Sequence, residues 1–411
     1  METVTKKTPV VLLTGWDTAR ADELAAPGTV VVHHDLSGLA EGLVVRTETT
    51  LSAGQAGDMP QRQALDTRIA VLELAHGCVS CTLRKDLLPL LRALHRRPGV
   101  ERIVLRLDPV LEAEAIAHAV EHVVVSMAGE TGAAASRSDI PDGPAGLDVE
   151  IAAVVGFVGE GWLDDALGDA DLADRFATTE DDERTVAQLA VGHVQWADAV
   201  VVSDSPDPAR LRAVVRRLAP GVPICRESVP LPRVLERAVG SARVGGAGPW
   251  APLLAGAPPL EPDGDVALLD FAATRPFHPG RLHEAVDTLL DGVVTARGRV
   301  WLATSPDAML WLESAGQGLR VGVAGSWDDC PDPLVWDEGR GNRHTSLVVL
   351  TAGADPGVVR RVLAWALVTD GELEHPGEWA RWEDPFGGFH VDPCTEPALG
   401  TRESVDERTA E

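Results

Sequence analysis

The segment that decides the fold is His76-Gly77-Cys78-Val79-Ser80-Cys81-Thr82-Leu83-Arg84. Residues 68–74 before it are mostly apolar, as in a buried strand. After it, leucines recur at helical spacing from Leu83 to Leu94. Cys78 and Cys81 are therefore expected in a strand-to-helix turn, near the free N–H groups of a helix N-terminus that favour thiolate. Two thiolates on one turn are half of a tetrahedral zinc site.

Composition bounds the class of protein. The chain has 411 residues, 45% of them hydrophobic, which is enough for two domains with a core in each. A net charge of −27 disfavours direct binding to nucleic acid and leaves a basic protein partner electrostatically allowed. The five cysteines are too few and too irregular for a disulfide framework. The start of the chain is charged, and residues 10–13 are too short for an export or membrane segment, so we expect a cytoplasmic protein without a membrane partner.

Strand and helix patterns alternate through residues 1–240. Such alternation predicts an α/β fold, with a parallel sheet and helices on both faces. The predicted strands are 9–15, 29–35, 43–46, 68–74, 102–107, 150–157, 199–204 and 222–225. The predicted helices are 19–26, 83–94, 111–125, 182–196, 208–218 and 231–239. Residues 126–149 are predicted to be a mobile surface loop.

A second domain is predicted after a Gly- and Pro-rich linker at residues 241–265. It spans residues 266–390, and a disordered acidic tail follows at 391–411. Its predicted order is strand, helix, three strands and helix, which suits a small α+β domain. The strands are 266–271, 298–303, 320–323 and 346–351, and the helices 279–290 and 355–366.

The cysteine segment resembles the glycine–cysteine–x–cysteine–cysteine motif of the CobW family of P-loop metal-handling GTPases. Ser80 stands at the middle cysteine, and His76 at the asparagine before the glycine. Four later stretches resemble the signatures of the CobW C-terminal domain: residues 275–279, 296–303, 314–316 and 325–327. The resemblance implies a P-loop-NTPase-like sheet followed by a CobW C-terminal domain. We expect Trp301 to anchor a sheet face, Gly298 and Gly316 to permit turns, and His278 to cap or pack.

The phosphate-binding loop of that family is degenerate here. A P-loop needs glycines whose backbone N–H groups cradle phosphates, a lysine for their charge and a hydroxyl for magnesium. After Gly15, the matching positions hold Arg20 for the second glycine, Ala21 for the lysine and Asp22 for the threonine. Asp22 would lie where a triphosphate sits, as would Asp17. Binding of GTP with magnesium is therefore disfavoured.

Two further nucleotide elements are eroded. The guanine-reading asparagine–lysine–x–aspartate is replaced by residues 203–206, with Asp207 one place late. The family's glutamate–x–x–glycine is missing, and only Asp108-Pro109 is kept after the strand at 102–107. No catalytic residue is predicted, because no acid–base or nucleophile pair stands out by spacing.

The predicted metal ligands are Cys78, Cys81, His76, His33 and His34. His33 and His34 end a strand at the carboxyl edge of the sheet, where the cysteine turn also emerges. Neutral imidazole and thiolate both suit zinc. Alternatives remain open, because the thiols could be half-buried and inert, the pair could be a redox dithiol, and the histidines could be solvated. Cys330, beside several aspartates, is a weaker metal candidate.

The resemblance extends to an actinobacterial branch of the family, the ribosome hibernation factor-recruiting proteins. That branch combines a lost P-loop lysine, a C-x-x-C and an intact C-terminal domain. It implies a zinc-responsive, non-catalytic adaptor that brings a hibernation factor to ribosomes when zinc is scarce. The alternative is a GTP-dependent zinc metallochaperone with residual GTPase activity. A cobalt chaperone would need the same nucleotide site.

Overall fold

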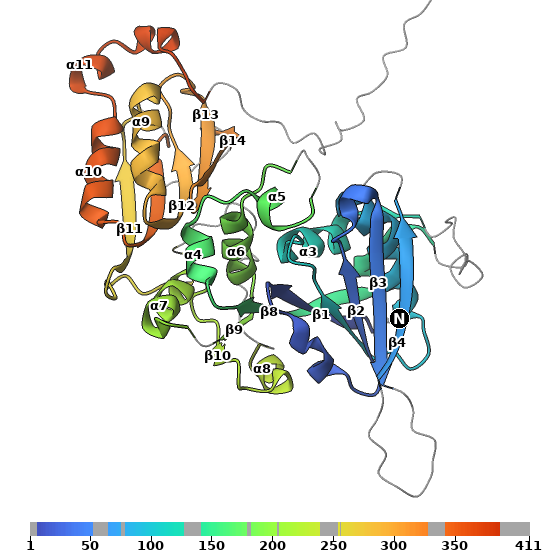
Figure 1. The fold of residues 1–411 in the computed structure, drawn as a ribbon. Coiled ribbons are helices and arrows are strands. Elements are labelled where there is room, and N and C mark those ends of the chain that lie inside the picture. The colour runs from blue at the N-terminus through green and yellow to red at the C-terminus, as the bar shows by residue number, and fades with distance from the viewer. Residues whose placement is uncertain are drawn as a thin grey trace, which may run out of the picture.

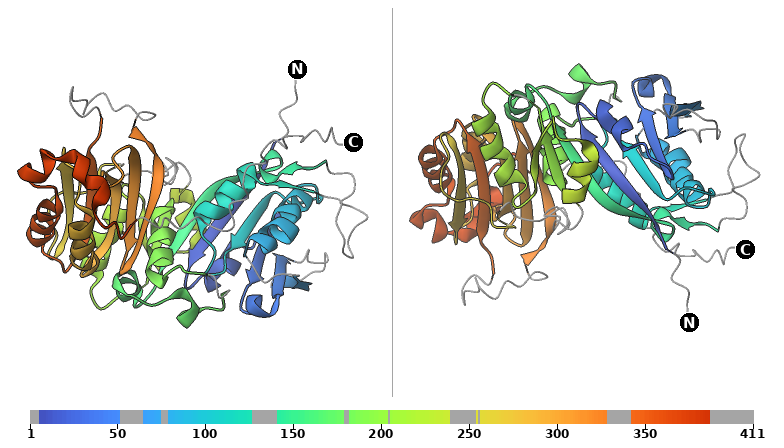
Figure 2. Two further views of the ribbon diagram at one scale, coloured as in Figure 1. Left: turned by 90° about the horizontal axis from the view of Figure 1, so that it is seen from above. Right: turned by 90° about the horizontal axis from the view of Figure 1, so that it is seen from below.

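The computed structural model describes residues 6–51, 65–74, 79–126, 141–178, 182–203, 205–238, 254, 256–327 and 342–386. Within these ranges the chain forms an eight-stranded sheet and a five-stranded sheet, each with its own helices (Figure 1). The two units lie side by side (Figure 2). The predicted cysteine turn is described only from Val79 onward, so Cys78 and His76 lie outside these ranges.

The first sheet has the strand order β10-β9-β8-β1-β5-β2-β3-β4. Its strands are β1 (Thr8–Gly15), β2 (Thr29–Asp35), β3 (Leu43–Leu51), β4 (Leu65–Glu73), β5 (Arg102–Arg106), β8 (Val149–Val158), β9 (Ala199–Val202) and β10 (Ile224–Arg226). The strands from β10 to β2 are parallel, whereas β3 is antiparallel to both β2 and β4. The α/β prediction is confirmed, but the sheet is mostly rather than wholly parallel. A parallel crossover needs a long connection, and β2 joins β3 through only the short 3₁₀ turn η2 (Leu39–Glu41).

Helices cover both faces of this sheet because its strands carry apolar side chains on both sides. Leu12 packs in the core beneath α2 (Leu88–His95), α3 (Ala113–His122) and α6 (Val186–Gln195). Its neighbour Leu13 points to the opposite face, beneath η1 (Ala19–Leu24) and α8 (Leu231–Ala238). This unit also contains α4 (Trp162–Leu167), α5 (Leu172–Arg175) and α7 (Pro208–Leu218).

The helix of the cysteine segment begins earlier than its leucine pattern, so Cys81 lies inside it and not in the predicted turn before it. It begins as α1 (Val79–Thr82), passes through the π-helical turn η3 (Leu83–Leu87) and continues as α2. The predicted loop at 126–149 is wrong at its described end, where residues 143–147 form β7 (Gly143–Pro144) and η5 (Ala145–Leu147). β7 pairs with β6 (Val124–Val125), and the buried guanidinium of Arg92 donates to the Gly143 carbonyl over 3.1 Å. This tertiary contact has no local sequence signal.

The second sheet is antiparallel, with the order β11-β15-β12-β13-β14. Its strands are β11 (Val266–Ala273), β12 (Val293–Val300), β13 (Ala308–Ala315), β14 (Gly318–Ser326) and β15 (Thr345–Ala352). Its outer face packs against α9 (Pro279–Leu290) and α10 (Pro356–Ala366), and α11 (Asp370–Leu373) and the 3₁₀ helix η8 (Pro376–Arg381) follow. The prediction missed β13, because both faces of that strand are largely buried and its sequence lacks the polar–apolar alternation of a half-exposed strand.

The other face of the second sheet packs directly on the first unit. Val294, Ala315 and Leu350 share one apolar core with side chains of α4, α6 and α7. At Gly316, whose φ is +51°, a Cβ would lie 2.4 Å from the Gly168 carbonyl oxygen, so only glycine fits the turn. The two units therefore share a core in addition to the chain that joins them.

His278 and Trp301 have structural roles in the second domain. His278 caps α9, because its Nδ1 accepts the Arg281 N–H, and its ring stacks on Trp382. Trp301 is buried against Met309 and Trp327. Both expectations are confirmed. Gly298 is not in a turn: it lies inside β12, where a Cβ would sit 2.0 Å from a carbonyl oxygen of β15.

Candidate functional site

The first candidate site lies at the end of β1, where a P-loop would stand. The segment forms the six-residue 3₁₀ helix η1, where a short helix was predicted over residues 19–26. Ala21, at the position of the lysine, is only 2% exposed and packs in the apolar core beside α8. Asp17 and Asp22 are exposed. A side chain at position 21 therefore points into the core and not toward a phosphate.

Trp16 covers the end of β1. Its ring lies 5.2 Å from the ring of Phe176 and 5.1 Å from that of His193, and its Nε1–H donates to Asp165 over 2.9 Å. The guanidinium of Arg175 lies over the Trp16 ring at 5.1 Å and also pairs with Asp165. A glycine-rich loop would leave this space open, whereas here an aromatic cluster fills it.

Arg20, at the position of the second glycine, has a structural role. Its guanidinium pairs with Glu23 over 2.7 Å and donates to the carbonyls of Glu227 and Val229 in the connection before α8. Glu23 in turn accepts the Leu231 N–H over 3.0 Å. These contacts hold η1 against α8. The Arg20 guanidinium is fully engaged by groups of the protein itself.

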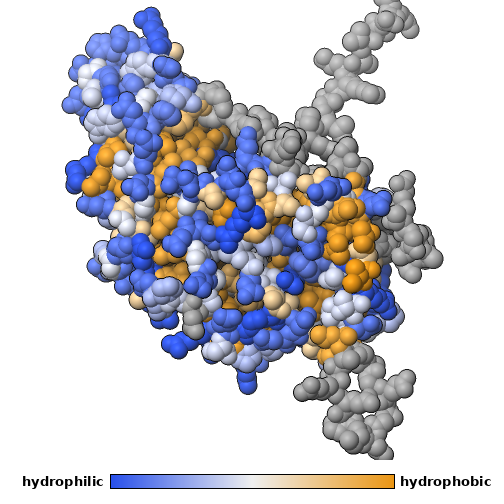
Figure 3. Space-filling view, in the orientation of Figure 1, coloured by the Kyte–Doolittle hydropathy of each residue, from blue (hydrophilic) through white to orange (hydrophobic). Residues whose placement is uncertain are grey.

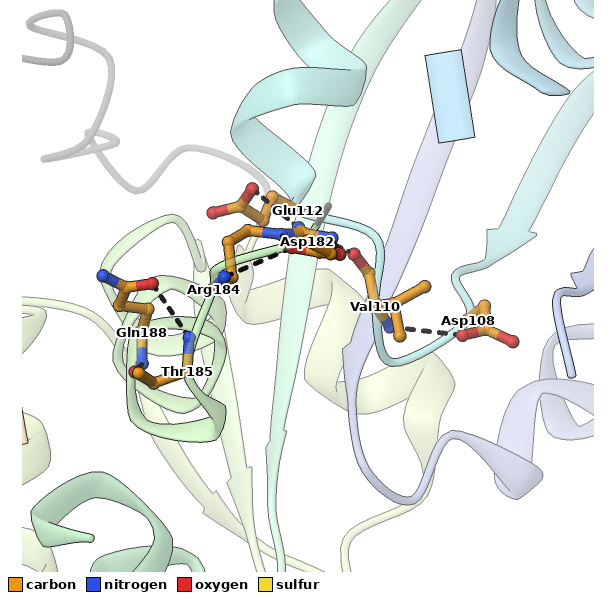
Figure 4. Close-up of polar contacts among 7 residues, drawn as sticks. All are labelled: Asp108, Val110, Glu112, Asp182, Arg184, Thr185 and Gln188. Atoms are coloured by element: carbon orange, nitrogen blue, oxygen red, sulfur yellow. Dashed lines mark hydrogen bonds and ion pairs between the residues drawn. The ribbon is translucent and has the colours of Figure 1, made fainter. Parts of the chain in front are cut away.

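The loop after β5 is held from two sides (Figure 4). Asp108, which the family resemblance retains, accepts the backbone N–H groups of Leu36 and Val110. Arg184, just before α6, donates to the Val110 carbonyl and pairs with Glu112 and Asp182. Burial raises the pKa of Asp108, although the two N–H donors act in the opposite direction. The Asp108 carboxylate therefore holds the loop itself. Arg184 was not singled out from the sequence, because Val110 and Glu112 lie 74 and 72 positions away from it along the chain.

The capping box beside Arg184 fixes the start of α6. The Thr185 side chain accepts the Gln188 N–H, and the Gln188 side chain accepts the Thr185 N–H (Figure 4). The threonine–x–x–glutamine spacing was a readable signal for this helix start, which lies a few residues after the predicted one.

The described residues at the guanine-reading position, 203 and 205–207, also have structural roles. Ser203 donates its hydroxyl to the Val158 carbonyl over 3.3 Å. Asp207 is the N-cap of α7 and accepts the Arg210 N–H over 3.0 Å. Asp204 lies outside the described residues.

The two strand-end histidines point to opposite faces of the sheet. Successive residues of a strand alternate, so His33 faces the η1 side while His34 faces the α2 side. His33 Nδ1 lies 3.0 Å from the Arg106 carbonyl oxygen, and burial lowers the pKa of this imidazole. The structure therefore does not bring His33 and His34 to one metal ion.

His34 is joined to the cysteine-bearing helix. Its Nε2 lies 2.8 Å from Asp86 in η3, and Arg46 pairs with the other oxygen of the same carboxylate. Burial acts to raise the pKa of Asp86, but the hydrogen bond with His34 and the charge of Arg46 bring it below its ordinary value. A histidine whose one nitrogen bonds a carboxylate presents the other nitrogen to a metal in many zinc sites. Asp86 was not predicted, although it lies on the same helix as Cys81.

Most of the cysteines lie outside the residues that the structure describes. Cys81 lies in α1, and the structure does not define its side chain, while Cys78, His76, Cys330 and Cys394 lie outside the described ranges. Among described side chains no group of three or more His, Cys, Asp or Glu is placed to hold a metal ion. Cys225 is buried in the core. No helix in the described part of the chain is long and apolar enough to cross a membrane.

His193, in the aromatic cluster, leads to a prediction about acid stability. Burial lowers its pKa from 6.5 to about 4. Between these values the unfolded chain binds a proton that the folded protein does not, so stability is lost as the pH falls from 6.5 toward 4, by about 3 kcal/mol in full. We expect His193→Gln to flatten this part of the pH dependence in urea unfolding. The exposed His122→Gln should keep the wild-type profile, and an unchanged profile in His193→Gln would contradict the assignment.

The fold defines an α/β protein of the P-loop-NTPase type, with a 3₁₀ helix and an aromatic cluster at the end of its first strand. Two family profiles match the chain: CobW/HypB/UreG, nucleotide-binding domain, over residues 53–218, and cobalamin synthesis protein cobW C-terminal domain, over residues 266–367. The chain belongs to the CobW family. The nucleotide-binding match begins after η1, so the segment that would form the phosphate loop lies outside it.

Relatives support this assignment. The chain is 44% identical to "Zinc chaperone Rv0106" of Mycobacterium tuberculosis, over 95% of each chain. It is 22% identical to "Zinc-regulated GTPase metalloprotein activator 1" of Dictyostelium discoideum, over 77% of this chain and 70% of that one. The solved structure of Zn(II)-bound YjiA GTPase from E. coli is 12% identical to this chain, over 89% of this chain and all of that one. Its TM-score is 0.33, so this similarity carries no argument.

Proposed function

We propose that this chain is a zinc-responsive, non-catalytic CobW-family adaptor that recruits a hibernation factor to ribosomes in the cytoplasm under zinc limitation. The observation that carries the non-catalytic part is the structure at the end of β1. Trp16 fills the space of the phosphate cradle, and the residue at the lysine position is buried in the apolar core. Phosphate binding at this place would require η1 to leave α8.

Zinc is supported by the relatives' names and by the chemistry of the residues. One relative is named a zinc chaperone and another a zinc-regulated activator. Cys78 and Cys81 would supply thiolates, and His34 would supply Nδ1, since its Nε2 is engaged by Asp86. His76 stays a candidate for the fourth position. His33 faces the other side of the sheet and would have to act separately.

Charge favours a protein partner. With a net charge of −27, the surface is suited to a basic protein and repels the phosphates of RNA. The adaptor would therefore contact a ribosome-associated protein or the hibernation factor itself, and not RNA directly.

Calorimetry separates the proposal from its enzymatic alternative. We expect Mg-GTP to give no binding heat at micromolar concentrations, and purified wild type to hold about one zinc ion per chain. The Cys78→Ala/Cys81→Ala double variant should lose that zinc, whereas Cys225→Ala, which removes a thiol from the core, should keep it. Micromolar GTP affinity, or full zinc content in the double variant, would contradict the proposal.

Affinity capture tests the partner. From zinc-starved cells, the tagged chain should enrich ribosomal proteins and the hibernation factor, and zinc-fed cells should give much less. Equal enrichment under both conditions would contradict the zinc response. If neither ribosomal proteins nor the hibernation factor is enriched, the adaptor role is wrong.

The alternative is a GTP-dependent zinc metallochaperone with residual GTPase activity. It is favoured by the relative named a zinc-regulated GTPase, which covers most of both chains. It requires nucleotide at the end of β1, and the calorimetric experiment therefore decides between the two.

A further inference from the structure

Among the described residues, nothing covers the outer edge of the first sheet. β4 is its last strand, nine residues long, and within the described ranges no strand pairs with its outer side. Ile69 is 69% exposed and Val71 is 62% exposed. Proteins normally shield such an edge with lysines, proline, a bulge or a covering helix, because it can pair with another strand.

The sheet face beside this edge is apolar, and no described residue covers it. Figure 1 shows β3 and β4 with one face toward the viewer and no described helix in front of it. The same region is a continuous hydrophobic area in Figure 3. Leu65, Ile69 and Val71 lie on this face, since they alternate with Asp66, Arg68 and Ala70. We call Leu65, Ile69 and Val71 the β4 patch.

The backbone of β4 is oriented for a further strand. The Leu74 N–H donates inward to the Gly42 carbonyl over 2.8 Å. In an antiparallel pair every second residue bonds the same neighbour, so Leu72, Ala70 and Arg68 also face β3. The N–H and C=O groups of Thr67, Ile69 and Val71 consequently point outward, away from β3.

The sequence of β4 is complementary to itself. If two copies pair antiparallel about a twofold axis at Thr67, Asp66 of one copy lies opposite Arg68 of the other, twice. On the open face, Leu65 lies opposite Ile69, also twice. Opposite charges and apolar pairs directly across an antiparallel ladder are the favourable cross-strand pairs.

We propose that this protein forms a homodimer by antiparallel pairing of β4 with β4 of a second copy, centred on Thr67. The two eight-stranded sheets then become one continuous sheet, and the two β4 patches join on one face. This inference does not depend on the zinc or nucleotide chemistry.

Other registers are less complementary. A twofold at Arg68 places the two Arg68 side chains opposite each other, and like charges across a ladder repel. A twofold at Ile69 places Leu65 opposite Glu73 and Asp66 opposite Leu72. Only the pairing centred on Thr67 matches both the charged and the apolar side chains near the axis.

The oligomeric state, measured by sedimentation equilibrium on the full chain, tests the proposal. We expect a dimer for wild type at tens of micromolar and a monomer for Ile69→Lys. Asp66→Arg and Arg68→Asp should each weaken the dimer, and the Asp66→Arg/Arg68→Asp double variant should restore it, because the opposite charges face each other again. Circular dichroism melts confirm that each variant folds, which is expected because these positions are exposed.

A cysteine at the axis tests the register. Thr67→Cys should give an oxidised dimer on a non-reducing gel, beyond any cross-link seen in wild type, while Ala70→Cys should not. A monomeric wild type, including one whose β4 instead binds a different protein, overturns the proposal. So does a dimer that Ile69→Lys leaves intact, or a double variant no better than its single parents.

Discussion

Replacing Ala21 with lysine is expected to lower the free energy of unfolding by about 3–4 kcal/mol and to confer no affinity for GTP. The change restores the residue type that a P-loop requires at this position. In this fold, however, the side chain enters the core between η1 and α8, where an ammonium group would have no partner. Urea unfolding measures the loss, and calorimetry with Mg-GTP measures the affinity.

The matched control is Asp22→Lys, on the neighbouring exposed position of the same 3₁₀ helix. It introduces the same side chain and should change stability by only a few tenths of a kcal/mol. If Ala21→Lys is as stable as Asp22→Lys, position 21 does not face the core in solution. If it also gains GTP binding, the segment can still form a phosphate cradle, and the non-catalytic proposal is wrong.

Asp86→Ala is expected to destabilise the protein by about 3–5 kcal/mol, because it leaves Arg46 and His34 without their shared carboxylate in a nearly buried position. The pKa of Asp86 lies below its ordinary value, so this contribution is present above the ordinary carboxyl range. It is lost as the pH falls through the folded-state pKa. Thermal unfolding across acid pH should therefore show the difference between wild type and variant shrinking at low pH.

Glu236→Ala supplies the comparison, since it removes an ion pair with Arg233 in which both side chains are largely exposed. Exposed pairs contribute at most about 1 kcal/mol. A similar small loss in Asp86→Ala would show that the contacts among His34, Arg46 and Asp86 do not anchor the cysteine-bearing helix to the sheet.

Much of the fold could be predicted because it depends on local patterns. Apolar runs and helical spacing predicted most strands and helices of the first unit, but not α4, α5, β6 or β7. The C-terminal patterns predicted most of the second unit, but not β13. A parallel sheet was predicted, although the short connection after β2 could have indicated that β3 is antiparallel. The opposite orientation of His33 and His34 could also have been predicted from the sequence, since neighbouring residues of a strand point to opposite faces.

The sequence by itself determined the family and the presence of a C-x-x-C thiol pair, because each is a matter of residue type at a fixed spacing. Only the tertiary structure decided which side chains pack at the end of β1 and beside the cysteine-bearing helix. Trp16 meets Asp165 across 149 positions of the chain, and His34 meets Asp86 across 52. Such contacts depend on how strands and helices are stacked, and the pattern of neighbouring residues does not encode that arrangement.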